Sequence, residues 1–411
     1  MVGESMPRLS VVIPSFNHKQ YVQQCVDSVL RQAYREFEVI VVDDGSTDGS
    51  LDILRAYGDA ITLICQANRG TQAARNAAIA ASSGELIAIL DSDDFWLPHK
   101  LAAQVALFEA RPELGLVYAF ADTVNPAGER TSIGWHLGAA VTHPAGALAQ
   151  LLLGCHVPAL TAVFRRTCID DVGLFDESLL GSGDWDLWIR IAARYPIACV
   201  EQVLACYRIH PTNTTKLLFR TKAIRTEHTQ VLHKAFELPQ VKSLPQEIRD
   251  RALARTHLSA AEAEAMGGDA AQAGIELRTA IELDPTLLHD GNWLEARLLL
   301  WSQLHAAASL LPNPYRRYAA EVFPPLADVV PHTSRLRRRV LSLSTMGVVF
   351  SAHAAGDHRR VRQLLPTGVS ADPHWLLNPG VWSIAADAFL GQQLTTPLRR
   401  TLRRAAPTRD R

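Results

Sequence analysis

The sequence lacks the cysteine pairs and the charge imbalance that mark several classes of protein. Its six cysteines are scattered along the chain, and none of them forms a CxxC pair. A zinc site or a redox motif is therefore not expected, and reduced thiols favour a cytoplasmic protein. The net charge is −1 at pH 7, so the composition does not indicate nucleic acid as a partner.

Long hydrophobic runs are also missing. The first run, Leu9 to Ile13, ends at Pro14 and is too short for a secretory signal peptide. An uncharged stretch at residues 145–164 is interrupted by polar residues and a proline, which argues against a membrane span. We interpret that stretch as buried core.

A glycine-rich phosphate loop is absent after the first apolar run, where the sequence reads PSFNH. A dinucleotide-dependent dehydrogenase needs the pattern G-x-G-x-x-G at this place. A sugar-1-phosphate nucleotidyltransferase normally has a glycine-rich loop there as well. Both classes of enzyme are therefore disfavoured.

The first 120 residues alternate between strand-like and helix-like segments. The predicted strands cover residues 9–13, 37–42, 61–65, 86–90 and 116–118, and the predicted helices cover 18–31, a stretch through 53–54, and 71–81. The strands are continuously apolar rather than alternating, which is typical of burial on both faces. The pattern predicts an α/β fold with a mostly parallel sheet and helices on both of its faces.

Two acidic clusters follow predicted strands, at residues 43–46 and 91–94. Ligands of α/β proteins bind beyond the carboxyl ends of parallel strands. The first cluster, DDGS, is by itself typical of an Asp-Gly turn. The second, DSDD, places three carboxylates within four residues, and these repel one another unless a cation or a ligand neutralises them. Because oxygen ligands suit Mg²⁺ or Mn²⁺ bound to substrate phosphates, this cluster predicts a metal-bridged diphosphate.

Four segments carry a resemblance to a known family. They read SVVIPSFNHKQYVQQCVDSVLRQ, EVIVVDDGSTDGS, NRGTQAARNAAIAASSGELIAILDSDDFWLPHKL and GDWDLWIRIA. In order and spacing they resemble the signatures of inverting family-2 glycosyltransferases of the GT-A fold, over roughly residues 9–215. The resemblance implies a GT-A catalytic domain at residues 1–220, a nucleotide-sugar donor (a UDP-sugar foremost), and Mn²⁺ or Mg²⁺ as the cofactor.

The resemblance assigns the nucleotide-sugar site to loops that follow the strands. The residues assigned to it are Pro14, Ser15, Asn17, Asp44, Arg75, Asp91 and Ser92. Asp44 is expected to hydrogen-bond the uracil or the ribose, and Asp91 to lie nearer the ribose. The expected metal ligands are Asp93, foremost, with Asp91 and His210; a purely structural role for His210 remains open.

Sugar transfer also needs a base that takes the proton of the acceptor. The resemblance assigns this role to Asp184 in the segment GDWDLW, where the next apolar residues recur at helical spacing. Asp184 then stands at a helix N-terminus, where an aspartate is also a common cap. The family's pattern has Glu immediately before this aspartate, whereas this sequence has Gly183. Asp186 is the alternative base.

The second half of the chain, residues 221–411, is predicted to form a separate helical domain. Two Gly-Asp pairs, at 268 and 356, are each followed by an Asp-Pro pair at the same interval. This repetition resembles the second helix of tetratricopeptide-type repeats, which stack into a concave binding surface. The alternative is an irregular helical bundle that stabilises the enzyme or forms a homo-oligomer.

Basic residues cluster at 335–339 and in the last thirteen residues of the chain. We interpret both clusters as solvated surface. The alternative is peripheral contact with anionic lipids at the inner face of the cytoplasmic membrane.

The acceptor is not specified by these motifs, because acceptor sites in this fold are built from variable loops, here residues 125–159. A cell-surface or lipid-linked glycan is the expected acceptor. Since bacteriocin S- and O-glycosyltransferases join such a catalytic domain to a tetratricopeptide-like tail, a peptide bound by the helical domain is the alternative. A non-catalytic helical-repeat scaffold is the alternative of another class.

Overall fold

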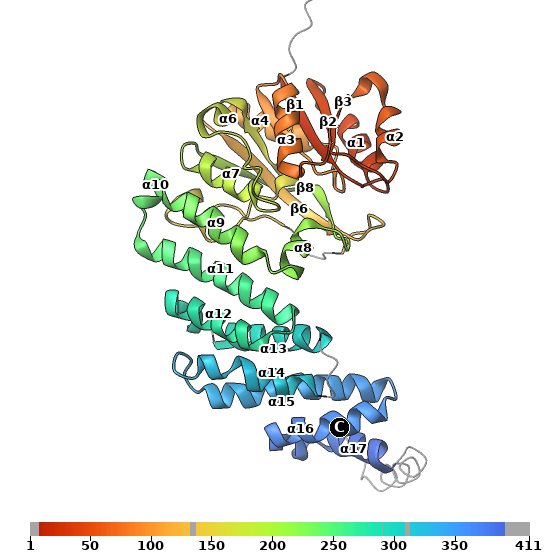
Figure 1. Ribbon diagram of the computed structural model, residues 1–411, viewed down its shortest axis with the longest axis vertical. Coiled ribbons are helices and arrows are strands. Elements are labelled where there is room, and N and C mark those ends of the chain that lie inside the picture. Colours follow the sequence, from red (N-terminus) through yellow and green to blue (C-terminus); the bar gives the residue numbers. More distant parts are fainter. Residues whose placement is uncertain (1–7, 132–136, 290, 309–312, 391–411) are drawn as a thin grey trace, which may run out of the picture. The chain divides into compact units, whose positions relative to one another are not determined.

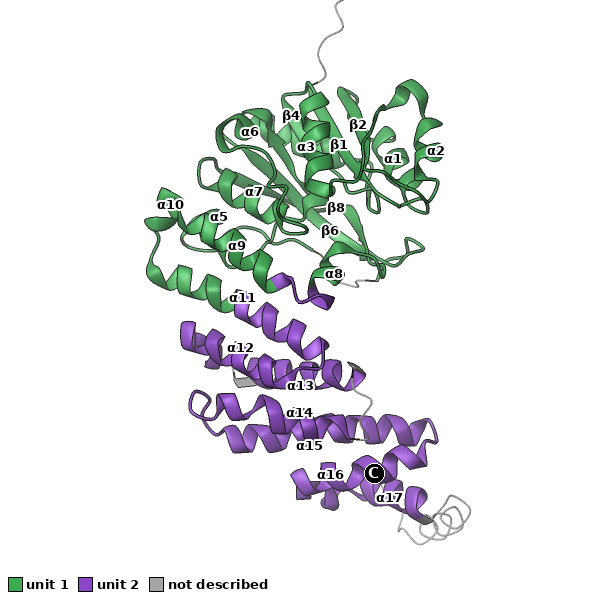
Figure 2. Ribbon diagram, viewed as in Figure 1, with its two compact units in different colours: residues 1–218, 225–255 green, residues 219–224, 256–411 purple. Residues whose placement is uncertain are grey.

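The computed structural model describes residues 8–131, 137–289, 291–308 and 313–390. The chain divides into two compact units (Figure 2). Unit 1 comprises Met1–Leu218 and Arg225–Arg255, and unit 2 comprises Phe219–Ile224 and Thr256–Arg411. The domain boundary expected from the sequence lies at residue 220, whereas the structure groups most residues from there to 255 with unit 1.

Among the described residues, unit 1 is built on an eight-stranded mixed sheet (Figure 1). Its strands are β1 (Leu9–Ser15), β2 (Phe37–Asp43), β3 (Thr62–Cys65), β4 (Leu86–Ile89), β5 (Phe95–Trp96), β6 (Leu116–Val124), β7 (Val163–Arg165) and β8 (Ile197–Arg208). The spatial order is β3-β2-β1-β4-β7-β6-β8-β5. The first four strands are parallel to one another, β7 is antiparallel to both of its neighbours, and β8 is parallel to β6. The α/β class predicted from the sequence is confirmed.

Helices cover both faces of the sheet. One face carries α1 (Val22–Leu30), α2 (Ser50–Arg55) and α4 (Lys100–Ala110). The other carries α3 (Thr71–Ala81), α5 (Gly146–Leu152), α6 (Arg166–Val172), α7 (Gly183–Ala192), α9 (Ile224–Phe236) and α10 (Pro239–Lys242), while η1 (Gly58–Ala60), η2 (Ala159–Thr161) and α8 (Thr214–Arg220) are short connections. Along β1, Val11 and Ile13 pack in the hydrophobic core beneath α1, α2 and α4, and Val12 packs in the core on the opposite face of the sheet. Burial on both faces explains why the strand is a continuous apolar run.

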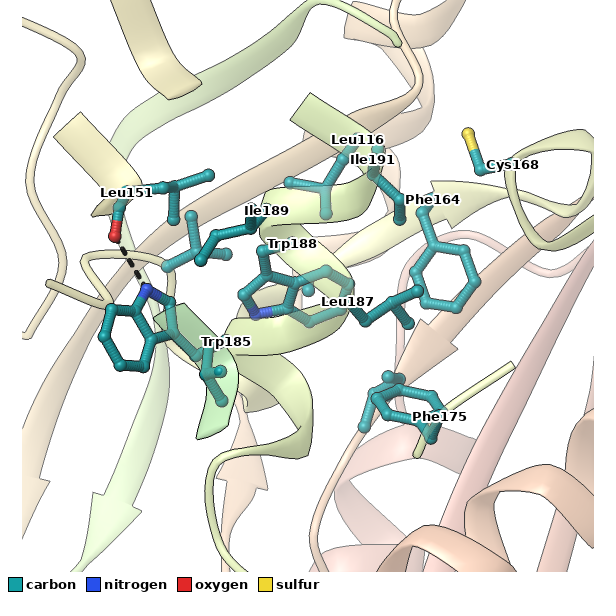
Figure 3. Close-up of a cluster of buried hydrophobic side chains, with 14 of the residues drawn as sticks. Leu116, Leu151, Phe164, Cys168, Phe175, Trp185, Leu187, Trp188, Ile189 and Ile191 are labelled. Atoms are coloured by element: carbon teal, nitrogen blue, oxygen red, sulfur yellow. Dashed lines mark hydrogen bonds between the residues drawn. The ribbon is translucent and has the colours of Figure 1, made fainter. Parts of the chain in front are cut away.

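Helix α7 is fixed by aromatic packing against the sheet (Figure 3). Trp188 is fully buried, with its ring centroid 5.7 Å from that of Phe164 and 6.4 Å from that of Phe175. The indole N–H of Trp185 donates to the carbonyl oxygen of Leu151, 2.7 Å away. Burying one large apolar side chain stabilises a fold by ~1.5–3 kcal/mol. These contacts therefore set the position of the first turn of α7.

Helix α9 holds the loop that leads into α7. The carboxylate of Glu227 accepts hydrogen bonds from the backbone N–H groups of the three consecutive residues 180–182. Two turns further along α9, the ammonium of Lys234 lies 2.6 Å from a carboxylate oxygen of Asp186 in α7. Residues of α9 thus complete unit 1, although they follow the boundary set from the sequence.

Truncation before α9 is expected to unfold unit 1. A chain that ends at residue 223 loses Glu227 and the buried side chains of Val231 and Leu232. Each large aliphatic side chain removed from a core costs ~2–5 kcal/mol, against a typical stability of ~5–15 kcal/mol. A chain that ends at residue 268 keeps these groups and is the matched control. Circular dichroism should show a cooperative thermal transition for the longer fragment alone; equal transitions would contradict the assignment of α9 to unit 1.

Unit 2 contains helices and no strand among its described residues. Its helices are the second half of α11 (Gln246–Met266), α12 (Ala270–Leu283), η3 (Pro285–Leu288), α13 (Gly291–Ala308), α14 (Pro314–Val322), η4 (Pro324–Leu326), α15 (Thr333–Ala354), α16 (His358–Ala371), η5 (Pro373–Leu377) and α17 (Pro379–Leu390). The helix-rich second half predicted from the sequence is confirmed. None of the described helices in the chain is long and apolar enough to cross a lipid bilayer.

The two Gly-Asp and Asp-Pro copies adopt the same local structure. Asp269 and Asp357 cap α12 and α16 by accepting a hydrogen bond from the backbone N–H three residues on. Asp284 and Asp372 then cap η3 and η5 by accepting from the N–H two residues on. Each copy is therefore a long helix, a capped 14-residue helix and a 3₁₀ turn. The tetratricopeptide-like assignment itself stays a prediction.

Candidate active site

The predicted site residues follow the carboxyl ends of three adjacent parallel strands. β1 leads into the loop with Asn17 and His18, β2 into Asp44, and β4 into the acidic segment 91–94. The carboxyl ends of neighbouring parallel strands meet at one edge of a sheet, where α/β proteins bind their ligands. The sheet order thus brings together residues that are up to about 80 positions apart in the sequence.

Asp91 pairs with an arginine of α3. Its Oδ1 lies 2.7 Å from Nη2 of Arg75, and the buried Arg75 side chain also donates from Nη1 to Oε1 of Gln72 at 3.2 Å. The Arg75 guanidinium stands over the ring of Phe175, 5.3 Å from its centroid. Arg75 is therefore a buried, charged group fixed beside Asp91 rather than a solvated helix-face residue.

Asp93 is joined by two histidines. Its Oδ2 lies 2.8 Å from Nε2 of His210 and 3.9 Å from Nε2 of His18. Burial alone would raise the pKa of Asp93, but the hydrogen bond from His210 and the nearby His18 outweigh it, so that the pKa is lowered. One ligand atom from each of the three residues lies within 4.8 Å of the others. This donor set fits a divalent metal ion, and Asp91, predicted as a ligand, is not part of the set.

Asp94 and Arg208 lock the acidic segment onto β8. Oδ1 of Asp94 accepts from the backbone N–H of Arg208 at 2.7 Å, and Nε of Arg208 donates to the carbonyl oxygen of Asp93 at 2.7 Å. The guanidinium of Arg208 stacks over the ring of Tyr21, 4.6 Å from its centroid. Burial and the charges of Asp93 and Asp91 raise the pKa of Asp94 well above its usual value. The segment is thus held rigidly on both sides.

Asp44 and Asp43 differ in their surroundings. The Asp44 carboxylate accepts from Nε2 of Gln66 and from the backbone N–H groups of Arg69 and Gly70, at 2.7–2.9 Å. Asp43 uses Oδ1 to accept from the N–H of Ser46 at 3.0 Å, while its buried Oδ2 has no hydrogen-bond partner among the described residues. Asp44, selected from the sequence, therefore holds the loop at residues 66–70, and the adjacent carboxylate has the free oxygen.

The residues of the β1 loop serve different purposes. Pro14 and Ser15 are the last two residues of β1. The buried hydroxyl of Ser15 has no partner within the described part of the chain. Asn17 is instead engaged: its N–H donates to Oγ of Ser46, and its Oδ1 accepts from the N–H of Thr47 at 2.8 Å. Asn17 thus joins the loops after β1 and β2.

Asp184 lies in the first turn of α7, as the sequence predicts. Its Oδ1 accepts from the N–H of Trp185 at 2.8 Å. Burial raises the pKa of Asp184 to about 6, against the opposing charge of Arg75. The unusual Gly183 is explained by close packing, because a Cβ at this position would lie only 2.5 Å from the side chain of Gln72.

Asp186 is engaged in structural ion pairs. Its buried Oδ2 accepts from Nε and Nη2 of Arg190 at 2.9 and 2.7 Å, and its Oδ1 lies 2.6 Å from Lys234. Both carboxylate oxygens are therefore occupied by cations of α7 and α9. The geometry favours Asp184 over Asp186 as a group that reacts.

The sequence motifs did not predict that His18, Gln72 and Arg208 belong to the site. Gln72 stands three residues before Arg75 on one helix, a spacing that places two side chains on the same face and was a usable signal. Arg208 lies two residues before His210, but nothing in the sequence around it indicates that its side chain turns back onto Asp93. His18 had no signal beyond its place after the PSFN loop.

The loops after β1, β2 and β4 lie within a segment that matches a known protein family. The sequence model of the family described as "Glycosyl transferase family 2" matches residues 10–173. The matched segment includes β1, β2 and β4 with the acidic residues that follow them, and it ends before α7.

Curated relatives are similar to the first half of the chain. An uncharacterized glycosyltransferase of Nostoc sp. is 31% identical over 221 residues, which cover 50% of this chain and 66% of that protein. The chondroitin synthase of Escherichia coli is 31% identical over 51% of this chain and 30% of its own length. The E. coli UDP-Glc:alpha-D-GlcNAc-diphosphoundecaprenol beta-1,3-glucosyltransferase WfgD is 28% identical over 52% of this chain and 81% of its own. The chain thus spans less than two thirds of the first two of these relatives.

Two solved structures are similar at low identity. S. aureus TarS 1–349 in complex with UDP-GlcNAc is 17% identical with a TM-score of 0.49, over 90% of this chain and 92% of that one. The mannosyltransferase PcManGT from Pyrobaculum calidifontis, in complex with GDP-Man and Mn²⁺, is 22% identical with a TM-score of 0.47, over 79% of this chain and 86% of that one.

Proposed function

The chain belongs to glycosyltransferase family 2, and from this premise we propose that unit 1 transfers a sugar from a UDP-sugar to an acceptor hydroxyl with inversion. The observation that carries the proposal is the meeting of three groups at one edge of the sheet. These are the Asp91–Arg75 pair, the Asp93 cluster, and Asp184, whose pKa responds to both Arg75 and Asp91. They match the three needs of the reaction: contact with the nucleotide, neutralisation of the leaving group and a base.

In this proposal the donor nucleotide would lie across the ends of β1, β2 and α3. The buried oxygens of Ser15 and Asp43 have no hydrogen-bond partner among the described residues, and both residues adjoin the loops that would contact uridine. Buried polar atoms without a partner are costly, so a ligand that pairs with them is favoured. The relative WfgD is named for a UDP-glucose donor, which supports UDP as the nucleotide.

Asp93 and His210 are the residues that would hold the divalent ion. When bound, Mn²⁺ or Mg²⁺ stabilises the negative charge that develops on the departing diphosphate. Asp91, which pairs with Arg75 instead, is left to contact the ribose. Arg208 holds the acidic segment 91–94 in place while negative charge develops on the departing diphosphate.

Asp184 acts as the base. The acceptor oxygen forms a bond to C1 of the sugar while the bond from C1 to the diphosphate oxygen breaks, and its electron pair stays on the diphosphate. The acceptor proton moves to a carboxylate oxygen of Asp184. A pKa of about 6 leaves this carboxylate largely ionised at neutral pH and still basic enough to accept the proton.

The proposed acceptor is a cell-surface or lipid-linked glycan. The name of WfgD includes a diphosphoundecaprenol-linked acceptor, and such an acceptor would place the reaction at the inner face of the cytoplasmic membrane. The helical unit 2 is proposed to select or hold the acceptor, because the donor-side groups all lie in unit 1. A peptide acceptor bound by unit 2 is the second candidate.

A screen of purified protein tests this proposal. Hydrolysis of each of a panel of UDP-, GDP- and other nucleotide sugars would be measured by release of the nucleotide. Slow hydrolysis of one UDP-sugar supports the proposal, whereas no hydrolysis and no nucleotide binding would favour a non-catalytic scaffold. The chain that ends at residue 268 should hydrolyse the same donor but lose acceptor transfer if unit 2 holds the acceptor.

The rate of transfer at saturating donor is expected to fall below about pH 6. Asp184 must be ionised to accept a proton, and burial raises its pKa to about 6, so the active fraction falls as the pH drops through that value. Initial rates measured from pH 5 to 8 at constant ionic strength would show the decline. A rate that stays constant to about pH 5, with the protein still folded, would contradict the assigned base.

A further inference from the structure

His18 and His210 approach the same oxygen atom from two sides. Nε2 of His210 and Nε2 of His18 lie 2.8 Å and 3.9 Å from Oδ2 of Asp93. The two imidazole rings are nearly perpendicular, at 81°, with their centroids 5.7 Å apart. Ligands about 2.1 Å from one ion lie ~3–4 Å from one another. The two distances to Asp93 are therefore close to those between ligands that share an ion, and all three ligand atoms lie within 4.8 Å of one another.

Each histidine is anchored through its other ring nitrogen. Nδ1 of His18 lies 2.8 Å from Oγ of Ser92, and Nδ1 of His210 lies 2.9 Å from Oγ1 of Thr212. Each hydroxyl can accept from Nδ1–H, and with an ion bound this would hold the ring in the tautomer whose Nε2 carries a lone pair, as in metal-ligating histidines. Both rings thus present Nε2 toward Asp93 in the same manner.

The backbone around His18 is held on both sides. Asn17 has a φ of +53°, an uncommon conformation for a residue other than glycine, which persists where its surroundings enforce it. Its N–H donates to Oγ of Ser46, and the N–H of Lys19 donates to Oδ2 of Asp48 at 2.9 Å. The loop after β2 therefore fixes the residues before and after His18, and the imidazole is preorganised.

We propose that His18 is a third protein ligand of the divalent ion, beside Asp93 and His210, and that Ser92 is the positioning residue that orients it. The proposal rests on the proposed function, which requires an ion at this place. Two imidazoles and one carboxylate favour Mn²⁺ and other transition ions over Mg²⁺, which prefers oxygen ligands. These ligands would therefore select a transition ion such as Mn²⁺, whereas the sequence left Mn²⁺ and Mg²⁺ as alternatives.

Binding of Mn²⁺ alone to the full-length protein tests the assignment. Free Mn²⁺ would be measured by electron paramagnetic resonance, and the heat of binding by calorimetry. Loss of an outer-sphere partner of a metal ligand costs ~10–100-fold in affinity. Ser92→Ala should weaken Mn²⁺ binding within this range and His18→Ala by at least as much. The exposed His99 provides the matched control, and His99→Ala should bind Mn²⁺ like the wild type.

A comparison of two metals separates a ligand from a merely structural residue. In His18→Ala the affinity for Mg²⁺ should fall less than that for Mn²⁺, because a lost imidazole matters more to a transition ion. The side chain of His18 is 24% exposed, so its truncation leaves no large cavity. If melting temperatures nevertheless show unfolding, His18→Gln, which fills the same space, takes its place in the comparison.

Three results would overturn the assignment. One is an unchanged Mn²⁺ affinity of His18→Ala while Asp93→Ala loses binding. Another is a His18→Ala variant that binds UDP more weakly in EDTA yet binds Mn²⁺ normally, which would make His18 a diphosphate contact. The third is a wild-type protein that does not bind Mn²⁺. A wild-type protein that binds Mn²⁺ through His18 but turns over no nucleotide sugar would contradict the proposed function alone.

Discussion

Replacement of Asp184 by asparagine is expected to lower the rate of sugar transfer by ~10²–10⁴-fold, the usual contribution of a general base. The amide has nearly the same shape and can still accept the hydrogen bond that Oδ1 receives from the N–H of Trp185. Since the raised pKa shows that the buried charge is unfavourable, its removal should not destabilise α7. UDP binding measured by calorimetry should therefore stay unchanged while the rate constant for transfer falls.

The control for this variant is Asp170→Asn, the same chemical change on the exposed side of α6. It should transfer sugar at the wild-type rate. Asp186→Asn should mainly lower the melting temperature, because it weakens the ion pairs with Arg190 and Lys234. Near-normal turnover by Asp184→Asn, together with lost turnover by a folded Asp186→Asn, would move the role of base to Asp186.

Asp93→Ala is expected to abolish the part of UDP binding that depends on Mn²⁺. Oδ2 of Asp93 is the atom that both His18 and His210 face, so its removal takes away the charged ligand of the cluster. The loss should exceed the ~10–100-fold cost of an outer-sphere change. The fold should remain, because the variant relieves the repulsion that raises the pKa of Asp94.

The measurement is calorimetric titration with UDP in Mn²⁺ and in EDTA. Asp52→Ala removes an exposed carboxylate of α2 and serves as the control. The control should keep the difference between the two conditions, and Asp93→Ala should lose it. Equal UDP affinity of the wild type in Mn²⁺ and in EDTA would show that the donor binds without an ion.

The sheet and its acidic loops were predictable because their information is local. Strands buried on both faces are continuous apolar runs, and the carboxylates that end β2 and β4 follow those runs directly. The strands β5 and β7 were missed because they have only two and three residues. β8 was missed because the first half of this twelve-residue strand is partly exposed, which breaks up its apolar pattern.

The detailed roles within the loops were not predictable, because they depend on where side chains point. β2 ends at Asp43, and Asp44 follows it directly. The sequence does not tell that Asp44 turns to the N–H groups of residues 69 and 70 while Asp43 keeps a free oxygen. His18 reaches Asp93 only because the residues beside it are bonded to the loop after β2, about 30 positions away. Such contacts between distant segments leave no periodic signal.

The position of Glu227 has a consequence for protein engineering. This carboxylate accepts hydrogen bonds from the N–H groups of residues 180–182, just before the helix that carries Asp184. A chimaera that joins the first 220 residues to a foreign tail would keep every recognisable motif and lose the support of its proposed base. Chimaeras joined after residue 255 would retain that support, so exchange of tails between relatives should succeed only at the later junction.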